Sequence, residues 1–188
     1  MSLHPESGPP SRLPALTLVL GGARSGKSHH AETLIMDHVA ATDTRPIYIA
    51  TAEAGDTEML ERIAAHQDRR DTIWTTVETL IALDSAIEDH GRDGRPMLVD
   101  SLTLWLSNVL HAGLEPDSEI EKLLLAIDMA KSPIVIVSDE VGLGLVPDNA
   151  LGRAFRDALG HINQRIAAQA DRVDFVAAGI PLVLKDET

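Results

Sequence analysis

The chain has 188 residues, the length of one domain, and its 29 acidic and 16 basic residues give a formal net charge of −13. A charge this negative argues against broad nucleic-acid binding, which needs a basic surface. The absence of cysteine excludes disulfides, thiolate metal sites and cysteine nucleophiles. If the substrate is anionic, the few positive charges must therefore be concentrated at one site.

The N-terminal segment 1–14 contains four prolines and no apolar run of the kind found in secretory signals. We therefore expect a disordered leader at 1–14 and one domain at 15–188. No later segment reaches the roughly 18 apolar residues that a bilayer-spanning helix needs. The default expectation is a cytoplasmic protein without membrane insertion.

Short apolar runs then alternate with segments of helical period. The runs predict strands at 16–20, 46–50, 73–77, 96–99, 133–137, 173–178 and 182–184. The periodic segments predict helices at 27–39, 57–70, 79–90, 102–111, 118–130 and 148–170. Ser118 and Glu121 form a potential capping box for one helix, and the short segment 179–181 favours an antiparallel final pair of strands. This order is typical of an α/β domain with a mostly parallel sheet and helices on both faces.

A phosphate-binding motif, G-x-x-x-x-G-K-[ST], lies between the first predicted strand and the first predicted helix. Glycines in such a loop let backbone N–H groups surround an anion at a helix N-terminus. Lys27 would contact the β- and γ-phosphates, and the Ser28 hydroxyl would coordinate Mg²⁺. The nucleotide-binding loop is predicted to comprise Gly21, Gly22, Ala23, Arg24, Ser25, Gly26, Lys27 and Ser28.

A second ligand for Mg²⁺ is expected where a later strand ends. Asp100 directly follows the strand at 96–99 and is the best candidate, while Asp139 and Glu140 follow the strand at 133–137 and compete with it. Asp100 could also cap the helix that comes next. The capping role and the metal-binding role are compatible.

The predicted helix at 57–70 carries a cationic stripe, because Arg62, His66, Arg69 and Arg70 share one face. Such a stripe suits a polyphosphate: the arginines would bind phosphate oxygens, and the imidazole could attack phosphorus to give a phosphoramidate. The spacing alone favours the plainer interpretation, a solvated amphipathic helix with a surface histidine. For the other seven histidines we favour structural roles.

Several stretches carry a resemblance to a known family. They are the loop GGARSGKS followed by Ala31 and Glu32, YIATAE (48–53), DTEMLERIAAHQDRR (56–70), WTTVE (74–78), LVDSLTLWLSNVL (98–110), SDEVGLGLVPDNALGRAFRDALGHINQRIAAQADRV (138–173) and AGIPLVLK (178–185). Together they resemble the bifunctional adenosylcobinamide kinase / adenosylcobinamide-phosphate guanylyltransferase family of cobalamin biosynthesis, over residues 16–185. The resemblance implies a RecA-like P-loop fold with an antiparallel C-terminal strand.

The resemblance also implies two reactions and a set of partners. ATP or GTP would phosphorylate adenosylcobinamide, and GMP would then pass from GTP to that phosphate through a GMP–histidine intermediate, giving adenosylcobinamide-GDP and pyrophosphate. Members of the family assemble as homo-oligomers, with a trimer as the known arrangement. Mg²⁺ is expected to accompany the nucleotide.

The resemblance implies site residues as well. The histidine of the intermediate maps onto His66, so His66 and Lys27 are the catalytic candidates, and Ser28 and Asp100 are the metal candidates. Beyond the loop, nucleotide contacts map onto Ala50, Thr51, Ala52, Gln67, Asp68, Arg69, Arg70, Glu78 and Asp100. For Glu78 the assignment depends on the resemblance alone.

The sequence departs from the family pattern at two positions, since Asn is common in place of Asp139 and Cys in place of Ser101. For four residues of the long final helix, three roles stay open: contact with a neighbouring subunit, contact with the corrinoid, or exposure to solvent. They are Arg153, Arg156, Asn163 and Arg165.

Two alternatives are weaker. One is a P-loop kinase of another small molecule, with His66 as a bystander. The other is a nucleotide-dependent switch. A Ras-like switch would read guanine with an N-K-x-D motif, and no lysine in this chain follows an asparagine.

Overall fold

The computed structural model describes residues 12–52 and 73–187. The described strands are β1 (Leu16–Gly21), β2 (Ile47–Ala50), β3 (Thr75–Glu78), β4 (Met97–Asp100), β5 (Ile134–Asp139), β6 (Arg172–Ala177) and β7 (Ile180–Asp186). The described helices are α1 (Lys27–Thr42), α3 (Leu83–His90), α4 (Leu102–His111), α5 (Pro116–Met129) and α6 (Ala150–Gln169).

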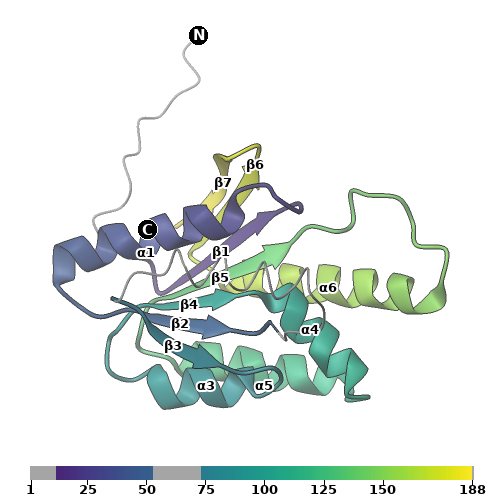
Figure 1. Ribbon diagram of the computed structural model, residues 1–188, viewed down its shortest axis with the longest axis horizontal. Coiled ribbons are helices and arrows are strands. Elements are labelled where there is room, and N and C mark those ends of the chain that lie inside the picture. The colour runs from purple at the N-terminus through teal and green to yellow at the C-terminus, as the bar shows by residue number, and fades with distance from the viewer. Residues whose placement is uncertain (1–11, 53–72, 188) are drawn as a thin grey trace, which may run out of the picture.

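These strands form one sheet in the order β3-β2-β4-β5-β1-β6-β7 (Figure 1). Every neighbouring pair is parallel except β6 and β7, which are antiparallel. The expected α/β fold with an antiparallel C-terminal strand is confirmed. Because β1 lies between β5 and β6, the loop that follows β1 sits in the interior of the carboxyl edge of the sheet.

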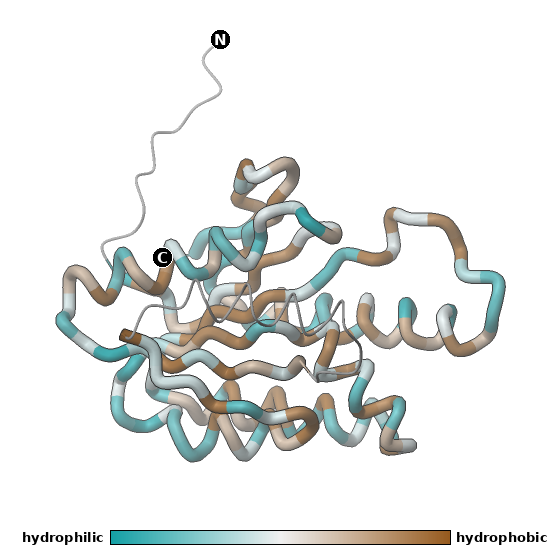
Figure 2. The backbone as a smooth tube through the Cα atoms, in the orientation of Figure 1, coloured by the Kyte–Doolittle hydropathy of each residue, from teal (hydrophilic) through white to brown (hydrophobic). Residues whose placement is uncertain are grey.

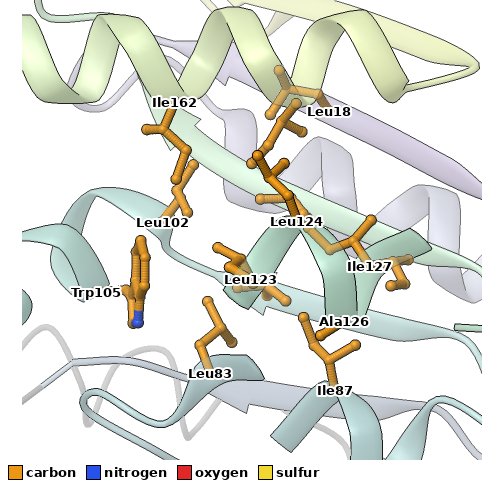
Figure 3. Packing of buried hydrophobic residues seen from close by; sticks show 14 of the residues in the cluster. Leu18, Leu83, Ile87, Leu102, Trp105, Leu123, Leu124, Ala126, Ile127 and Ile162 are labelled. Atoms are coloured by element: carbon orange, nitrogen blue, oxygen red, sulfur yellow. The ribbon is translucent and has the colours of Figure 1, made fainter. Parts of the chain in front are cut away.

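The two faces of the sheet are covered by different helices. Alternate residues of a strand point to opposite faces, and in β1 this places Leu18 in the cluster that packs on α3, α4, α5 and α6, and Val19 in the cluster that packs on α1. Hydrophobic residues accordingly run through the central strands in Figure 2. Figure 3 shows the larger cluster, with Trp105 of α4 close to Leu83 of α3 and Leu123 of α5.

Several element boundaries differ from the sequence-based expectation. Helix α5 begins at Pro116 after the N-cap Glu115, so the expected capping box of Ser118 and Glu121 is wrong. Proline suits the first turn of a helix because it lacks an N–H that would be unpaired there. The expected helix at 79–90 contracts to α3, and the expected strand at 73–77 shifts to β3.

The final hairpin is tighter than expected. Ala177 pairs with Ile180, so the connection is the two-residue turn Ala178-Gly179, with φ of 53° and 78°. Positive φ at both positions matches the twist of two-residue hairpins. Pro181, expected in the loop, lies in β7, where an edge strand tolerates a missing N–H.

The N-terminal segment is partly packed. Residues 1–11 of the expected leader lie outside the described residues, but Leu13 is buried and its N–H donates to Nδ1 of His38 in α1, at 3.2 Å. The packed chain therefore includes residues before 15. None of the helices in the described ranges is both long enough and apolar enough to cross a membrane.

Candidate nucleotide site

The phosphate-binding motif forms the loop between β1 and α1, as its sequence context predicts. Gly26 caps α1 with φ of 95°, a backbone conformation that side chains disfavour. The Gly179 N–H of the β6–β7 hairpin donates to the Ser25 carbonyl at 2.7 Å. A Cβ on Gly26 would lie 3.1 Å from the Gly179 Cα, so the loop and hairpin pack backbone to backbone.

The Ser25 hydroxyl lies beneath this loop. Its oxygen is buried, and it has no hydrogen-bond partner among the described residues. Buried hydroxyls are normally paired, so the Ser25 hydroxyl is a candidate donor to a phosphate in the loop.

Lys27 reaches back across the loop. Its Nζ lies 2.6 Å from Oδ1 of Asp139 and donates to the Gly22 carbonyl at 3.3 Å. The pair is possible because β1 and β5 are neighbours in the sheet, with Gly21 opposite Asp139. The ammonium group is thus already held over the loop, where a phosphate would meet it.

Asp139 is itself anchored by two helices. Its N–H donates to the Thr103 hydroxyl of α4 at 2.8 Å, and its carbonyl accepts from the Asn163 amide of α6 at 3.1 Å. Asn163 also accepts a buried hydrogen bond from the Ser138 hydroxyl, at 2.7 Å. These contacts fix the carboxyl end of β5, and with it the carboxylate that faces Lys27.

Asp100 lies at the carboxyl end of β4, opposite Ala50 of β2 and Val137 of β5. Its Oδ2 accepts from the Tyr48 hydroxyl at 2.7 Å. The N-cap of α4 is Ser101, whose hydroxyl accepts from the Leu104 N–H, so the alternative capping role for Asp100 is wrong. Asp100 and Asp139 thus end two adjacent strands at one edge of the sheet.

The other described candidates meet at the same edge. Ala50 is the register partner of both Asp100 and Glu78, and Glu78 is exposed. Thr51 is buried: its hydroxyl donates to the Ser101 carbonyl at 2.7 Å and accepts from the Ser101 N–H at 2.9 Å. The structure therefore places the loop, Ala50, Thr51, Ala52, Glu78 and Asp100 along one edge.

The second half of the expected site lies outside the described residues. This applies to the catalytic candidate His66 and to Gln67, Asp68, Arg69 and Arg70. Across 12–52 and 73–187, no group of three or more His, Cys, Asp or Glu residues is arranged to hold a metal ion.

The four residues of α6 that sequence left open have intramolecular contacts. Asn163 is buried beneath Asp139, as described above. Arg165 pairs with Glu121 of α5 at 2.8 Å, Arg156 with its neighbour Asp157 at 2.9 Å, and Arg153 donates to the Pro147 carbonyl at 3.0 Å. Asn163, Arg165 and Arg153 therefore tie α6 to β5, to α5 and to the loop before it, while the Arg156 pair lies within α6.

Sequence reasoning missed a buried ionic network behind the loop. His30, in the first turn of α1, lies with Nε2 2.8 Å from Oδ2 of Asp174, a fully buried carboxylate on β6. The Arg172 Nε lies 3.0 Å from the other oxygen of Asp174. The signal in the sequence is one acidic residue, Asp174, in the otherwise apolar strand predicted at 173–178. The sequence does not show which side chain pairs with it.

Comparisons with known proteins agree with this geometry. The sequence model of the family described as "Cobinamide kinase / cobinamide phosphate guanyltransferase" matches residues 17–184. Among curated proteins, the chain is similar to the "Bifunctional adenosylcobalamin biosynthesis protein CobP" of Pseudomonas aeruginosa, with 45% identity over 90% of this chain and 97% of that protein. It is also similar to proteins named "Bifunctional adenosylcobalamin biosynthesis protein CobU" from Salmonella typhimurium (39%) and Escherichia coli (37%), each over 90% of this chain and 99% of the relative.

Among solved structures, the chain resembles the flagellar accessory protein FlaH of Methanocaldococcus jannaschii, with a TM-score of 0.51, 11% identity, and coverage of 93% of this chain and 80% of that one. At this identity the likeness concerns the fold alone.

Proposed function

Since this chain belongs to the cobinamide kinase / cobinamide phosphate guanyltransferase family, we propose that it catalyses two successive reactions in cobalamin biosynthesis. In the first, ATP or GTP phosphorylates the aminopropanol hydroxyl of adenosylcobinamide. In the second, GMP moves from GTP to the new phosphate, giving adenosylcobinamide-GDP and pyrophosphate. The observation that carries this proposal is the 45% identity to a bifunctional relative over 97% of that relative's length.

For the kinase reaction, the loop supplies the phosphate site. Backbone N–H groups at the start of α1 and the Lys27 ammonium stabilise the negative charge on the transferring phosphoryl group. Phosphate oxygens replace Asp139 as the partner of Lys27. The acceptor oxygen forms a bond to the γ-phosphorus and its proton passes to solvent, while the bond to the β-phosphate bridging oxygen breaks and the nucleoside diphosphate leaves.

The residues at this edge also fit a magnesium ion. The donors are all oxygens: the Ser28 hydroxyl and the Asp100 carboxylate, with Asp139 one strand away. Mg²⁺ prefers such hard ligands and commonly uses one or two carboxylates together with substrate phosphates. When bound, the ion would neutralise charge on the phosphate oxygens. Ser28 and Asp100 are the residues that we assign to it.

For the guanylyl transfer, His66 is the proposed nucleophile. A ring nitrogen forms a bond to the α-phosphorus of GTP as the bond to the pyrophosphate leaving group breaks. The phosphate of the corrinoid then attacks the same phosphorus and releases the histidine. Gln67, Asp68, Arg69 and Arg70 would bind the nucleotide beside it, and Ala50, Thr51, Ala52 and Glu78 would complete that site from the sheet edge.

The oligomeric state and the cellular location are also part of the proposal. We propose a homotrimer, as the family resemblance implies, acting in the cytoplasm where ATP and GTP are available. The alternative of a small-molecule kinase without guanylyl transfer is not favoured, because three relatives over 90% of the chain are named as bifunctional proteins of adenosylcobalamin biosynthesis.

One experiment tests both reactions. The protein is incubated with α-labelled GTP alone, and with γ-labelled GTP together with adenosylcobinamide. We expect the α label on the protein as an acid-labile, base-stable adduct that is lost in His66→Ala, because a phosphoramidate has this stability. We expect the γ label on adenosylcobinamide phosphate, lost in Lys27→Ala because the loop loses its point charge.

The matched control is His161→Ala, which removes an exposed histidine of α6. Undiminished α labelling of His66→Ala would remove this residue from the mechanism. Full γ transfer by Lys27→Ala would remove the loop from the kinase reaction.

A further inference from the structure

A pocket of about 300 Å³ lies between α4 and α6, beyond the carboxyl edge of the sheet. Its apolar wall comes from Leu110, Leu151 and Phe155, and its polar groups from Ser107, His111 and Asn149. No Asp, Glu, Lys or Arg is among its described lining residues. Ligand pockets in proteins are typically of this volume and above, and are mainly apolar with a few polar groups.

The pocket is joined to the nucleotide site by the two helices that hold Asp139. On α4, Ser107 and Leu110 follow Thr103 by four and seven residues and so share its face. At a rise of 1.5 Å per residue they lie roughly 6–11 Å along the helix from Thr103. On α6, Phe155 precedes Asn163 by eight residues, a distance of roughly 12 Å. The pocket therefore lies one to two helical turns from the residues that anchor the Lys27–Asp139 pair.

From this arrangement we propose that the α4–α6 pocket binds the corrinoid acceptor, an inference that rests on the function proposed above. The uncharged lining is unsuited to a nucleoside triphosphate, whose phosphates would bind at the loop that follows β1. It suits the edge of a corrin ring, which presents methyl groups and neutral amide side chains. Ser107 and His111 can meet the amides, while Leu110, Leu151 and Phe155 pack on the methyl groups; the Asn149 side chain caps α6 at this edge of the pocket.

The length of the acceptor's reactive arm agrees with this placement. In cobinamide the reacting hydroxyl ends an amide-linked arm seven covalent bonds from the ring, which spans roughly 9 Å when extended. This is comparable to the separation along α4 between the pocket and Thr103. A ring edge held in the pocket would therefore place the hydroxyl near Thr103, the residue whose hydroxyl anchors Asp139 beside Lys27.

The test compares variants of the pocket in the full-length protein. Leu151 is 63% exposed at the start of α6, so Leu151→Trp should fill the pocket without disturbing the core. We expect its KM for adenosylcobinamide to rise at least tenfold. Its rate of α-label transfer from GTP to the protein, which needs no acceptor, should stay unchanged. Leu125→Trp, at a 59% exposed position of α5, is the matched control and should leave both values unchanged.

A second variant covers the case in which Leu151→Trp fails to fold. Phe155→Ala removes an apolar wall, and we expect the same rise in the KM for the acceptor with an unchanged KM for GTP. If the wild-type protein does not phosphorylate adenosylcobinamide, the proposed function fails. If the wild-type protein does so and both variants keep its acceptor KM, the pocket proposal is overturned. A changed solution mass with an unchanged acceptor KM would assign the pocket to contact between copies of the chain, which also overturns it.

Discussion

His30 shows how one side chain can position the phosphate-binding loop without touching phosphate. It lies three residues after Lys27 and contacts the buried Asp174 of β6. A buried carboxylate needs charge-assisted hydrogen bonds, because it has lost its hydration. The Asp174 carboxylate therefore ties the first turn of α1 to the sheet, and His30 is a positioning residue for Lys27.

We expect His30→Ala to raise the KM for both GTP and ATP by about tenfold, the usual cost of one lost charge-assisted bond. Saturating kcat should change little, since the chemistry at Lys27 remains. Initial-rate kinetics with γ-labelled nucleotide measure both constants. His30→Gln, which keeps an amide donor, should recover most of the affinity.

The adjacent histidine is the control for this substitution. His29 is exposed on the same turn, so His29→Ala should keep the wild-type KM. Equal effects of His29→Ala and His30→Ala, or no rescue by glutamine, would assign the change to helix propensity rather than to the Asp174 contact.

Helix α5 packs into the fold through one apolar face. Leu123 is fully buried against α3 and α4, whereas Leu125 is 59% exposed two residues later. Figure 3 shows Leu123 pointing into the cluster beside Trp105 and Leu83. Burial of this face, together with the proline at the first helical position, stabilises a helix that lacks a capping side chain.

We expect Leu123→Ala to lower the free energy of unfolding by about 2–5 kcal/mol, because it removes buried methyl groups and leaves a cavity. Leu125→Ala should change it by less than about 0.5 kcal/mol. Urea titration followed by circular dichroism measures both variants. Similar losses in the two would mean that the exposed face of α5 is covered in solution.

The sequence predicted elements well where the signal is local. Helix α4 was predicted with its observed bounds, because a polar stretch and a glycine flank ten largely apolar residues. The start of α5 was missed because proline and a capping box gave competing local signals. The Lys27–Asp139 pair could not be chosen over Asp100 from sequence, because it depends on which strand lies beside β1. The contact between His30 and Asp174 could not be predicted either, because it depends on β6 lying beside β1.

Considered as one body, the protein combines a net charge of −13 with the nucleotide site that we propose around Lys27. Its stability also depends on one buried histidine in the helix that follows the loop. His38 accepts a hydrogen bond from the Leu13 N–H, which requires an unprotonated Nδ1. Burial, and secondarily the charge of Arg12, lower the pKa of His38 below its ordinary value of 6.5.

This shift gives the stability a pH dependence of known sign. Because the unfolded chain binds the proton more readily than the folded chain, the contribution of His38 is full above pH 6.5 and is lost as the pH falls through the folded pKa. Between pH 7.5 and pH 5, we expect the Tm of His38→Gln to fall by less than the Tm of the wild type. His29→Gln, exposed on the same helix, should keep the wild-type dependence. Parallel Tm profiles for His38→Gln and the wild type would contradict this account.

The position of β1 in the sheet also has a consequence for the order in which the protein is made. The phosphate-binding loop leaves the ribosome before both neighbours of its strand, because β5 and β6 are synthesised more than a hundred residues later. The loop also needs the Gly179 N–H from the turn that follows β6. Pairing across such long sequence separations is slow to form. The proposed nucleotide site therefore becomes complete only after β6 and the turn that follows it have been synthesised.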